Sequence, residues 1–224
     1  MSIEAQYRFV LKRIQDSCEK NRIAHQVDLL AVSKKQLIEK IKELYHIGHR
    51  KFGESYVQEA VEKIELLRDL EIEWHFIGPI QSNKTKYIAK YFDWVQSVDS
   101  MKILTRLNNQ RPEDKQLLNV LLQLKVGNEE SKSGCSEEEI FEMIKSSSEF
   151  AKLKIRGLMC IPPPAFDEKI QKEYFQYCYN VFKKLQMVAE LDTLSMGMSN
   201  DLESAIACQT TMVRVGTDVF GARD

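Results

Sequence analysis

The sequence alternates short apolar runs with stretches of helical periodicity, and this alternation is what most limits the folds open to the chain. In the first helical stretch, residues 3–18, apolar side chains recur every three or four positions, as on one face of an amphipathic helix. The run 27–32 that follows is short and apolar and ends in polar residues, which is typical of a buried strand. The same pair of elements then repeats to the end of the chain.

The pattern predicts eight strands, each followed by a helix or, at the end, by the tail. The expected strands are 27–32, 50–53, 73–78, 93–97, 117–126, 154–160, 192–196 and 211–215. The expected helices after the first are 36–48, 57–67, 83–91, 100–109, 136–149, 167–189 and 200–208. Within 105–116, the residues Asn108, Asn109 and Pro112 favour a loop.

Strands separated by helices imply parallel pairing with right-handed crossovers, and eight such units are the number that closes a (β/α)8 barrel. We therefore predict an α/β fold, a TIM-type barrel with an extra N-terminal helix, as one domain over residues 1–224. An open doubly wound sheet would show a similar alternation, so the pattern alone leaves both architectures open.

Composition and charge exclude several classes of protein. The formal net charge is -1, and the chain lacks the clustered basic excess that nucleic-acid binding needs. Charged Glu4, Arg8 and Lys12 interrupt the N-terminus, so it does not read as a signal peptide, and no run approaches the roughly 18 apolar residues of a membrane span. Five widely spaced cysteines without a C-x-x-C pair favour reduced thiols and a cytoplasmic protein.

Polar and flexible residues follow nearly every predicted strand. In a barrel the working groups lie where strands run into the following loops, at one face. The junctions are SKK (33–35), GES (53–55), GPIQSNK (78–84), SVD (97–99), VGNEESKSG (126–134), MCIPPP (159–164), SMGMSND (195–201) and GTD (216–218).

Two of these junctions are typical of a phosphate site. Ser199, Asn200, Gly216 and Thr217 offer hydroxyls and backbone N–H groups after the seventh and eighth strands, where barrels commonly bind phosphate. Ordinary capping of a helix by Ser199 or Asn200 would leave the same pattern.

Lys34 and Arg214 are the two charged residues that stand out. Lys34 follows an apolar run and would reach into the barrel mouth, where desolvation favours the neutral amine that imine chemistry needs. Arg214 interrupts the apolar strand TMVRV, and inside a barrel it would need an anion or another acceptor. The alternatives are a solvated Lys34 beside Lys35 and an outward-facing Arg214 paired with an acidic helix residue.

The remaining signals are weaker. His75 alternates with two aromatic residues and is either a polar group of the barrel interior or a core histidine. Lysines in the loops (Lys84, Lys86 and Lys132) could assist an anion. His46 and His49 are three residues apart but lack a third ligand nearby, so we expect no metal site. The Walker loop, the G-x-G-x-x-G fingerprint, the G-x-S-x-G elbow and the HExxH motif are all absent from the sequence.

Taken together, a set of motifs resembles the pyridoxal phosphate homeostasis protein family, also called proline synthase co-transcribed homologues. The motifs are AVSKK, FGESYVQEA, WHFIGPIQSNK, SVDS, EESKSG, IRGLMCIPPP, LSMGMSNDLESAI and VRVGTDVFGARD, from about residue 27 to the last residue. The resemblance implies a barrel like the N-terminal domain of alanine racemase that carries pyridoxal 5'-phosphate (PLP).

The resemblance also implies roles by position. Lys34 would be the Schiff-base lysine, Ser199, Gly216 and Thr217 would hold the phosphate, Arg214 would face the pyridine nitrogen, and His75 and Met196 would lie near the ring. The family usually reads FGEN where this chain has Gly53-Glu54-Ser55, so a cofactor contact at this position would come from the shorter Ser55.

The expected function is a PLP-binding protein of vitamin B6 and amino-acid homeostasis without established catalysis. An arginine cannot accept the proton that a protonated pyridine nitrogen shares with its partner, so PLP beside Arg214 should be a poor electron sink. We further expect no room for the second base that a racemase takes from another domain, a monomer, and PLP-dependent apoenzymes as conceivable partners. The alternatives are a weak amino-acid racemase and a barrel enzyme for a phosphorylated metabolite.

Overall fold

The parallel barrel predicted from the alternation is the architecture of the computed structural model, which describes residues 2–127 and 133–221. In this part of the chain, eight parallel strands close in the order β1 to β8, each pairing with its neighbours in the sequence and β8 with β1. The strands are β1 Asp28–Val32, β2 Lys51–Glu54, β3 Glu73–Phe76, β4 Trp94–Val98, β5 Leu118–Leu124, β6 Leu153–Cys160, β7 Thr193–Ser195 and β8 Met212–Val215.

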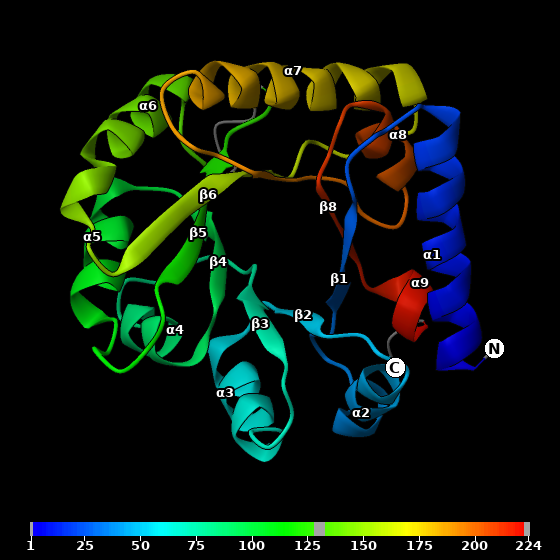
Figure 1. Ribbon diagram of the computed structural model, residues 1–224, viewed down its shortest axis with the longest axis horizontal. Helices are drawn as coiled ribbons and strands as arrows, with labels where there is room; N and C mark the ends of the chain where they lie inside the picture. Colours follow the sequence, from blue (N-terminus) through cyan, green and yellow to red (C-terminus); the bar gives the residue numbers. More distant parts are fainter. Residues whose placement is uncertain (1, 128–132, 222–224) are drawn as a thin grey trace.

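The helices form a ring around the barrel (Figure 1). They are α1 Ile3–Lys20, α2 Ile38–His46, α3 Val57–Leu66, α4 Thr85–Tyr91, α5 Met101–Gln110, α6 Glu137–Lys145, α7 Glu168–Gln186, α8 Leu202–Ala207 and α9 Thr217–Phe220, with a 3-10 turn at Ser146–Glu149. The extra N-terminal helix, α1, lies beside α8 and α9.

The closed sheet rules out the open doubly wound alternative, and the predicted elements are confirmed apart from their ends. Two details differ. Asn108 and Asn109 lie inside α5, because the helix continues to Gln110 before the chain turns toward β5. A helix of four residues, α9, follows β8 where only a tail was expected. Parts of EESKSG and of the final motif fall on 128–132 and 222–224, outside the described residues.

The core has two parts because strand side chains alternate between the two faces of the closed sheet. Outward-facing residues such as Phe52, Phe76 and Val213 join the apolar faces of the helices in one continuous core. Inside the barrel, Trp94, Leu121 and Met159 form a separate apolar cluster. The rest of the interior is partly polar, with His75, Gln96, Ser195 and Arg214 all buried.

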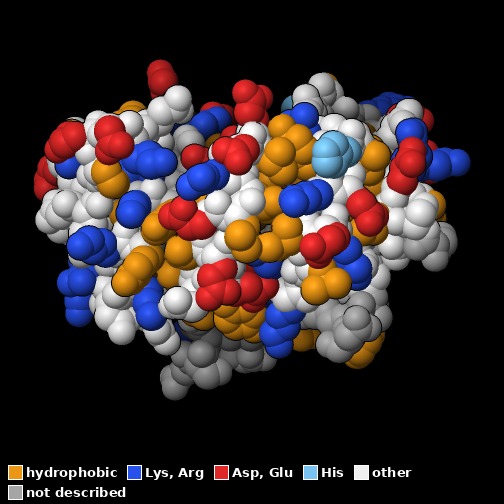
Figure 2. All heavy atoms as spheres, turned by 90° about the horizontal axis from the view of Figure 1, so that it is seen from below, with side chains coloured by type: hydrophobic (Ala, Val, Ile, Leu, Met, Phe, Trp, Pro, Cys, Tyr) orange, Lys and Arg blue, Asp and Glu red, His pale blue; other side chains and the backbone are white. Residues whose placement is uncertain are grey.

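Since all strands are parallel, their carboxyl ends meet at one rim, and the loops that follow them share that rim. The polar junctions predicted from the sequence therefore lie together in space. Among the described residues, no helix is both long enough and apolar enough to cross a membrane. Figure 2 shows one face of the molecule on which acidic and basic side chains are interspersed, without a patch of one sign.

His49 connects the N-terminal helix to the barrel. Its ring is buried, Nδ1 accepts a hydrogen bond from the hydroxyl of Tyr7 (3.4 Å), and Nε2 donates to the carbonyl oxygen of Lys51 at the start of β2 (2.7 Å). Burial lowers the pKa of His49 to about 4, and the charges of Lys51 and Arg50 act in the same direction. His49 is therefore neutral in the folded protein near neutral pH.

This lowered pKa predicts a pH dependence of stability. A histidine that titrates near 6.5 when unfolded and near 4 when folded contributes stability that is complete above pH 6.5 and is lost as the pH falls toward 4. The full difference corresponds to at most about 3 kcal/mol. We expect His49→Gln to remove this contribution from the fall in unfolding free energy between pH 6.5 and 4, measured by urea denaturation.

The matched control is His46→Gln, because His46 is exposed at the end of α2, three residues before His49. It should leave the wild-type pH dependence unchanged. If the unfolding free energy fell by the same amount between pH 6.5 and 4 in wild type and in His49→Gln, the prediction would be contradicted.

Candidate functional site

A cavity of about 800 Å³ lies at the carboxyl ends of the strands. Its walls come from the ends of β1, β3, β6 and β8 and from the loops after β6, β7 and β8. The lining includes Val32, Lys34, Ile77, the segment 161–166, Gln171, the segment 198–201, Arg214, Gly216 and Thr217. A volume in this range suits a small organic ligand or cofactor.

Lys34 lies on the cavity wall directly after β1 and is half-buried. Both of its neighbours in the chain are anchored to the helix side of the sheet. The hydroxyl of Ser33 donates to Oε1 of Glu54 (2.7 Å), and the backbone N–H of Lys35 donates to Oε1 of Glu59 (2.5 Å). The backbone that carries Lys34 is therefore fixed on both sides, while its side chain belongs to the cavity.

Lys63 of α3 holds this anchor together. Its ammonium donates to the carbonyl oxygen of Ser33 (2.7 Å), to Oε1 of Glu54 (2.8 Å) and to Oε1 of Glu59 (2.6 Å). Glu54 is fully buried, and burial raises its pKa although Lys63 opposes the shift. Oε2 of Glu54 finds no hydrogen-bond partner in the described part of the chain. The buried carboxyl group of Glu54 therefore depends on the ammonium group of Lys63 for charge compensation.

Arg214 faces the barrel interior, not a helix, which decides between the two orientations that the sequence left open. Nη1 donates to the carbonyl oxygen and to Oγ of Ser195, and Nη2 donates to the carbonyl oxygen of Cys160, all at 2.8 Å. The guanidinium thereby joins β6, β7 and β8 at the floor of the cavity. Burial lowers the pKa of Arg214, but a guanidinium titrates so high that it keeps its charge.

A chain of hydrogen bonds continues from Arg214 through the barrel. Oγ of Ser195 donates to Oε1 of Gln96 (2.7 Å), and Nε2 of Gln96 donates to Nδ1 of His75 (2.9 Å). Nε2 of His75 then donates to Glu73 (2.9 Å). Every donor points toward Glu73, so the acceptor role of Nδ1 assigns the Nε2–H tautomer to His75.

The position of His75 resolves its two sequence alternatives in favour of a barrel-interior group. Its ring stacks on Trp94 with centroids 5.1 Å apart and planes 11° from parallel. Burial lowers the pKa of His75, with Glu73 opposing, so the imidazole is neutral near neutral pH. Both ring nitrogens are used within the protein, which makes His75 a supporting group beneath the cavity.

The loops after β7 and β8 supply the hydroxyl end of the cavity. Ser199 and Asn200 lie in the turn before α8, and Gly216 and Thr217 lie where β8 passes into α9. The first N–H groups of any helix lack intrahelical partners, so these turns present donors as well as hydroxyls. They line the same cavity as Lys34, and β8 is the strand that pairs with β1, which carries Lys34 at its end.

Five of the eight residues singled out from the sequence therefore line one cavity: Lys34, Ser199, Arg214, Gly216 and Thr217. The other three lie outside its lining. Ser55 follows β2 with its backbone against Gly78, His75 lies within the barrel, and Met196 is fully buried in the core on the helix side of the sheet. A contact between any of these three and a ligand stays a prediction.

The structure adds groups that sequence reasoning missed. The junction MCIPPP (159–164), which the sequence places on the rim, contributes residues 161–164 to the cavity wall, and the structure adds Ala165 and Phe166 to it. Gln171 of α7 also reaches the cavity. Among the lysines considered for an anion, Lys84 and Lys86 are absent from this lining, and Lys132 lies outside the described residues.

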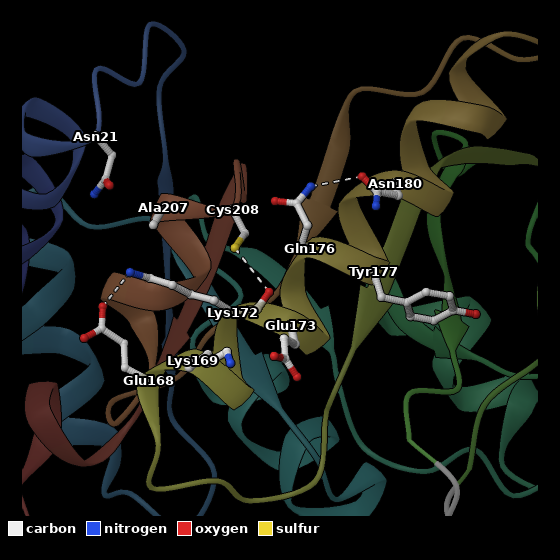
Figure 3. Close-up of a pocket in the computed structure, with 10 residues that line it drawn as sticks. All are labelled: Asn21, Glu168, Lys169, Lys172, Glu173, Gln176, Tyr177, Asn180, Ala207 and Cys208. Atoms are coloured by element: carbon white, nitrogen blue, oxygen red, sulfur yellow. Dashed lines mark hydrogen bonds and ion pairs between the residues drawn. The ribbon is translucent and has the colours of Figure 1, made fainter.

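A second hollow lies on the outside of the molecule, between α7, α8 and the end of α1. This groove of about 980 Å³ is lined by polar side chains of α7, and Figure 3 shows Glu168 and Lys172 paired at one end of it. It is larger than the cavity in the barrel, but its lining comes from helices and the ends of helices and not from the strand ends, and Glu168 and Lys172 already pair with each other. We therefore assign the functional site to the barrel cavity.

No group of three or more histidine, cysteine, aspartate or glutamate side chains in residues 2–127 and 133–221 is arranged to hold a metal ion. His46 and His49 do not converge, because Nδ1 of His46 contacts the carbonyl oxygen of Lys42 while both nitrogens of His49 are engaged elsewhere.

The chain is similar to known proteins over most of its length. The family model described as the alanine racemase N-terminal domain matches residues 11–224. A pyridoxal phosphate homeostasis protein of Pasteurella multocida is 46% identical over 230 aligned positions, which cover 100% of this chain and 99% of that protein.

Solved structures are similar over most of the chain. PipY of Synechococcus elongatus with PLP bound is 34% identical, with a TM-score of 0.81, and the match covers 93% of this chain and 100% of that one. The alanine racemase of Bartonella henselae with covalently bound pyridoxal phosphate is 16% identical, with a TM-score of 0.71, over 99% of this chain and 58% of that one. The latter similarity concerns the fold alone.

The Lys63 anchor leads to a stability prediction. Lys63→Met would leave the buried Glu54 without its counter-charge, and breaking a buried pair in this way costs about 3–5 kcal/mol. We expect a loss of unfolding free energy in this range by urea denaturation, and a smaller loss in Lys63→Met/Glu54→Gln, which removes both charges.

Lys145→Met is the control, because it breaks an exposed pair with Glu142 on α6. Exposed pairs contribute about 1 kcal/mol or less. Equal losses for Lys63→Met and Lys145→Met would show that the buried anchor is unimportant for stability.

Proposed function

We propose that this chain, which belongs to the pyridoxal phosphate homeostasis protein family, binds pyridoxal 5'-phosphate and acts in vitamin B6 and amino-acid homeostasis. We further propose that residues 1–224 form one PLP-binding barrel domain. The observation that carries the proposal is the single cavity that unites an amine, a buried guanidinium and a cluster of hydroxyl and N–H donors.

These groups fit the chemistry of the cofactor. PLP carries an aldehyde, a pyridine ring and a phosphate ester. In our proposal, Lys34 holds the aldehyde carbon as a Schiff base, and Ser199, Gly216 and Thr217 hold the phosphate. Arg214 donates to the pyridine nitrogen from the cavity floor. We also retain Ser55, His75 and Met196 as proposed neighbours of the ring, with His75 acting from beneath it through Gln96.

The environment of Arg214 supports a binding role over a catalytic one. When bound in an enzyme, PLP supplies an electron sink whose strength depends on a protonated pyridine nitrogen. Arg214 has only donors to offer, and its neighbours Ser195 and Cys160 keep the guanidinium in place. The chain therefore binds and orients the cofactor without raising its power to withdraw electrons, and we propose that it is not an enzyme.

We propose a cytoplasmic monomer that transfers PLP to apoenzymes. All five cysteines are free thiols, as suits a reducing compartment. The large exposed apolar side chains are distributed over several elements, which favours a monomer. Phe166 is fully exposed beside the cavity and offers a recipient protein an apolar contact at the point where the ligand leaves.

The assignment of Lys34 predicts a spectral signature. Protein loaded with PLP should be yellow, with a visible absorbance band, and borohydride should fix the cofactor to Lys34. Lys34→Ala should lose both properties, because no amine remains at this position to form the linkage.

Lys35→Ala is the control, because Lys35 is the next residue and its side chain is exposed while its N–H group binds Glu59. It should keep the band and the borohydride-fixed cofactor. The assignment is wrong if Lys34→Ala retains an adduct that borohydride fixes within the same cavity.

The non-catalytic role makes a second prediction. Single enantiomers of alanine and other amino acids, incubated in deuterated water with PLP-loaded protein, should exchange their Cα hydrogen no faster than with free PLP. Mass spectrometry measures the deuterium incorporated. Sustained exchange above the free cofactor, lost in Lys34→Ala, would instead support a weak racemase.

A further inference from the structure

Arg13 lies on α1, outside the barrel, yet its guanidinium is directed at the loops that carry the proposed phosphate site. Nε and Nη2 donate to the two carboxylate oxygens of Glu203 at 2.7 and 3.0 Å. Nη1 donates to Oδ2 of Asp218 (2.5 Å), and Nη2 also donates to the carbonyl oxygen of Ser199 (2.9 Å). All three guanidinium nitrogens are thus used.

The three acceptors belong to the two phosphate-end loops. Ser199 lies in the turn after β7, Glu203 lies in the first turn of α8, and Asp218 directly follows Thr217 in α9. One side chain therefore ties together two segments that leave the barrel from different strands. Figure 1 shows α1 running alongside both α8 and α9. The hydrogen bonds of Arg13 reach a residue of each of these two helices.

Besides joining the two loops, Arg13 compensates the negative charges of the carboxylates that it binds. Glu203 and Asp218 put two carboxylates next to the end of the cavity where a phosphate ester would carry its negative charge. Arg13 compensates both, and its hydrogen bond to Glu203 raises the pKa of an already basic group. Without Arg13, the loops would lose their common anchor and the bound anion would face uncompensated like charge.

We propose that Arg13 is a positioning residue that sets the preference of this protein for phosphorylated over non-phosphorylated pyridoxal. Arg13 is absent from the cavity lining, so it acts through Ser199 and the residues beside Thr217 and not by touching the ligand. The inference rests on the proposed function, because it assigns the phosphate to this end of the cavity.

The test compares two ligands that share the aldehyde and ring. PLP carries the phosphate ester, and pyridoxal carries a hydroxyl group in its place. In titrations followed by absorbance, Arg13→Gln should bind PLP about tenfold more weakly than wild type, which corresponds to about 1.4 kcal/mol. Its affinity for pyridoxal should stay within about twofold of wild type, since Lys34 and Arg214 are untouched.

Arg8→Gln is the matched control. Arg8 lies on the same helix, is largely exposed and pairs with Glu4 one turn away. It should bind both ligands as wild type does. Circular dichroism confirms that each variant is folded before it is titrated.

The outcomes separate the inference from the proposed function. Equal weakening of PLP and pyridoxal in Arg13→Gln would reduce Arg13 to a merely structural residue, and unchanged binding of both would also overturn the inference. Failure of wild type to bind PLP at all would overturn the proposed function instead.

Arg13→Lys decides the matter if Arg13→Gln does not fold. An ammonium keeps the charge but cannot span the planar set of acceptors that a guanidinium reaches. A selective loss of PLP affinity, smaller than tenfold, supports the inference. A loss shared equally by both ligands, or no loss, overturns it.

Discussion

The burial of one guanidinium inside a closed barrel is the constraint on which the site depends. A charge taken out of water is tolerated only when its donors are matched by acceptors. Arg214 meets this requirement with two backbone carbonyls and Ser195. Ser195 in turn needs Gln96, and Gln96 needs His75. The barrel interior is therefore polar along one path, and the registers of β3, β4 and β7 must bring these side chains to matching heights.

Side chains of the surrounding helices also stabilise the rim that carries the cavity, through contacts outside the barrel. Lys63 secures the turn that carries Lys34, and Arg13 secures the two turns that carry Ser199 and Thr217. In both cases a cation from a helix neutralises a pair of carboxylates and also binds a backbone carbonyl of the turn that follows a strand. Lys34 and the proposed phosphate-binding residues are thus held by groups that do not line the cavity.

Most of the fold could be predicted from the sequence because its signal is local. The apolar periods of 3.6 and 2 locate eight strand and helix pairs, and a helix as short as α9 escapes because four residues contain no period. The rim residues follow from the fold, since parallel strands end on one side. Lys34, Ser199 and Thr217 are therefore predictable as neighbours.

The supporting contacts could not be predicted because they join residues far apart in the chain. Ser195 and Gln96 are 99 positions apart, and Arg13 and Glu203 are 190 positions apart. Glu54 reads in the sequence as an ordinary polar residue after a strand, yet it is fully buried. The orientation of Arg214 was equally open, because a strand of four residues offers too little alternation to tell its inner face from its outer one.

The buried hydrogen bonds from Arg214 to Glu73 also bear on whether the cavity can exchange protons with a ligand that it binds. A site that must change protonation during a reaction needs a group whose pKa lies near the working pH. The floor of this cavity offers a guanidinium, and the imidazole beneath it is held neutral with both nitrogens occupied. Neither group can exchange a proton with a ligand without breaking the buried chain from Arg214 to Glu73. The same hydrogen bonds that make it possible to bury the charge therefore hold Arg214 and His75 in one protonation state, which agrees with the proposed binding role.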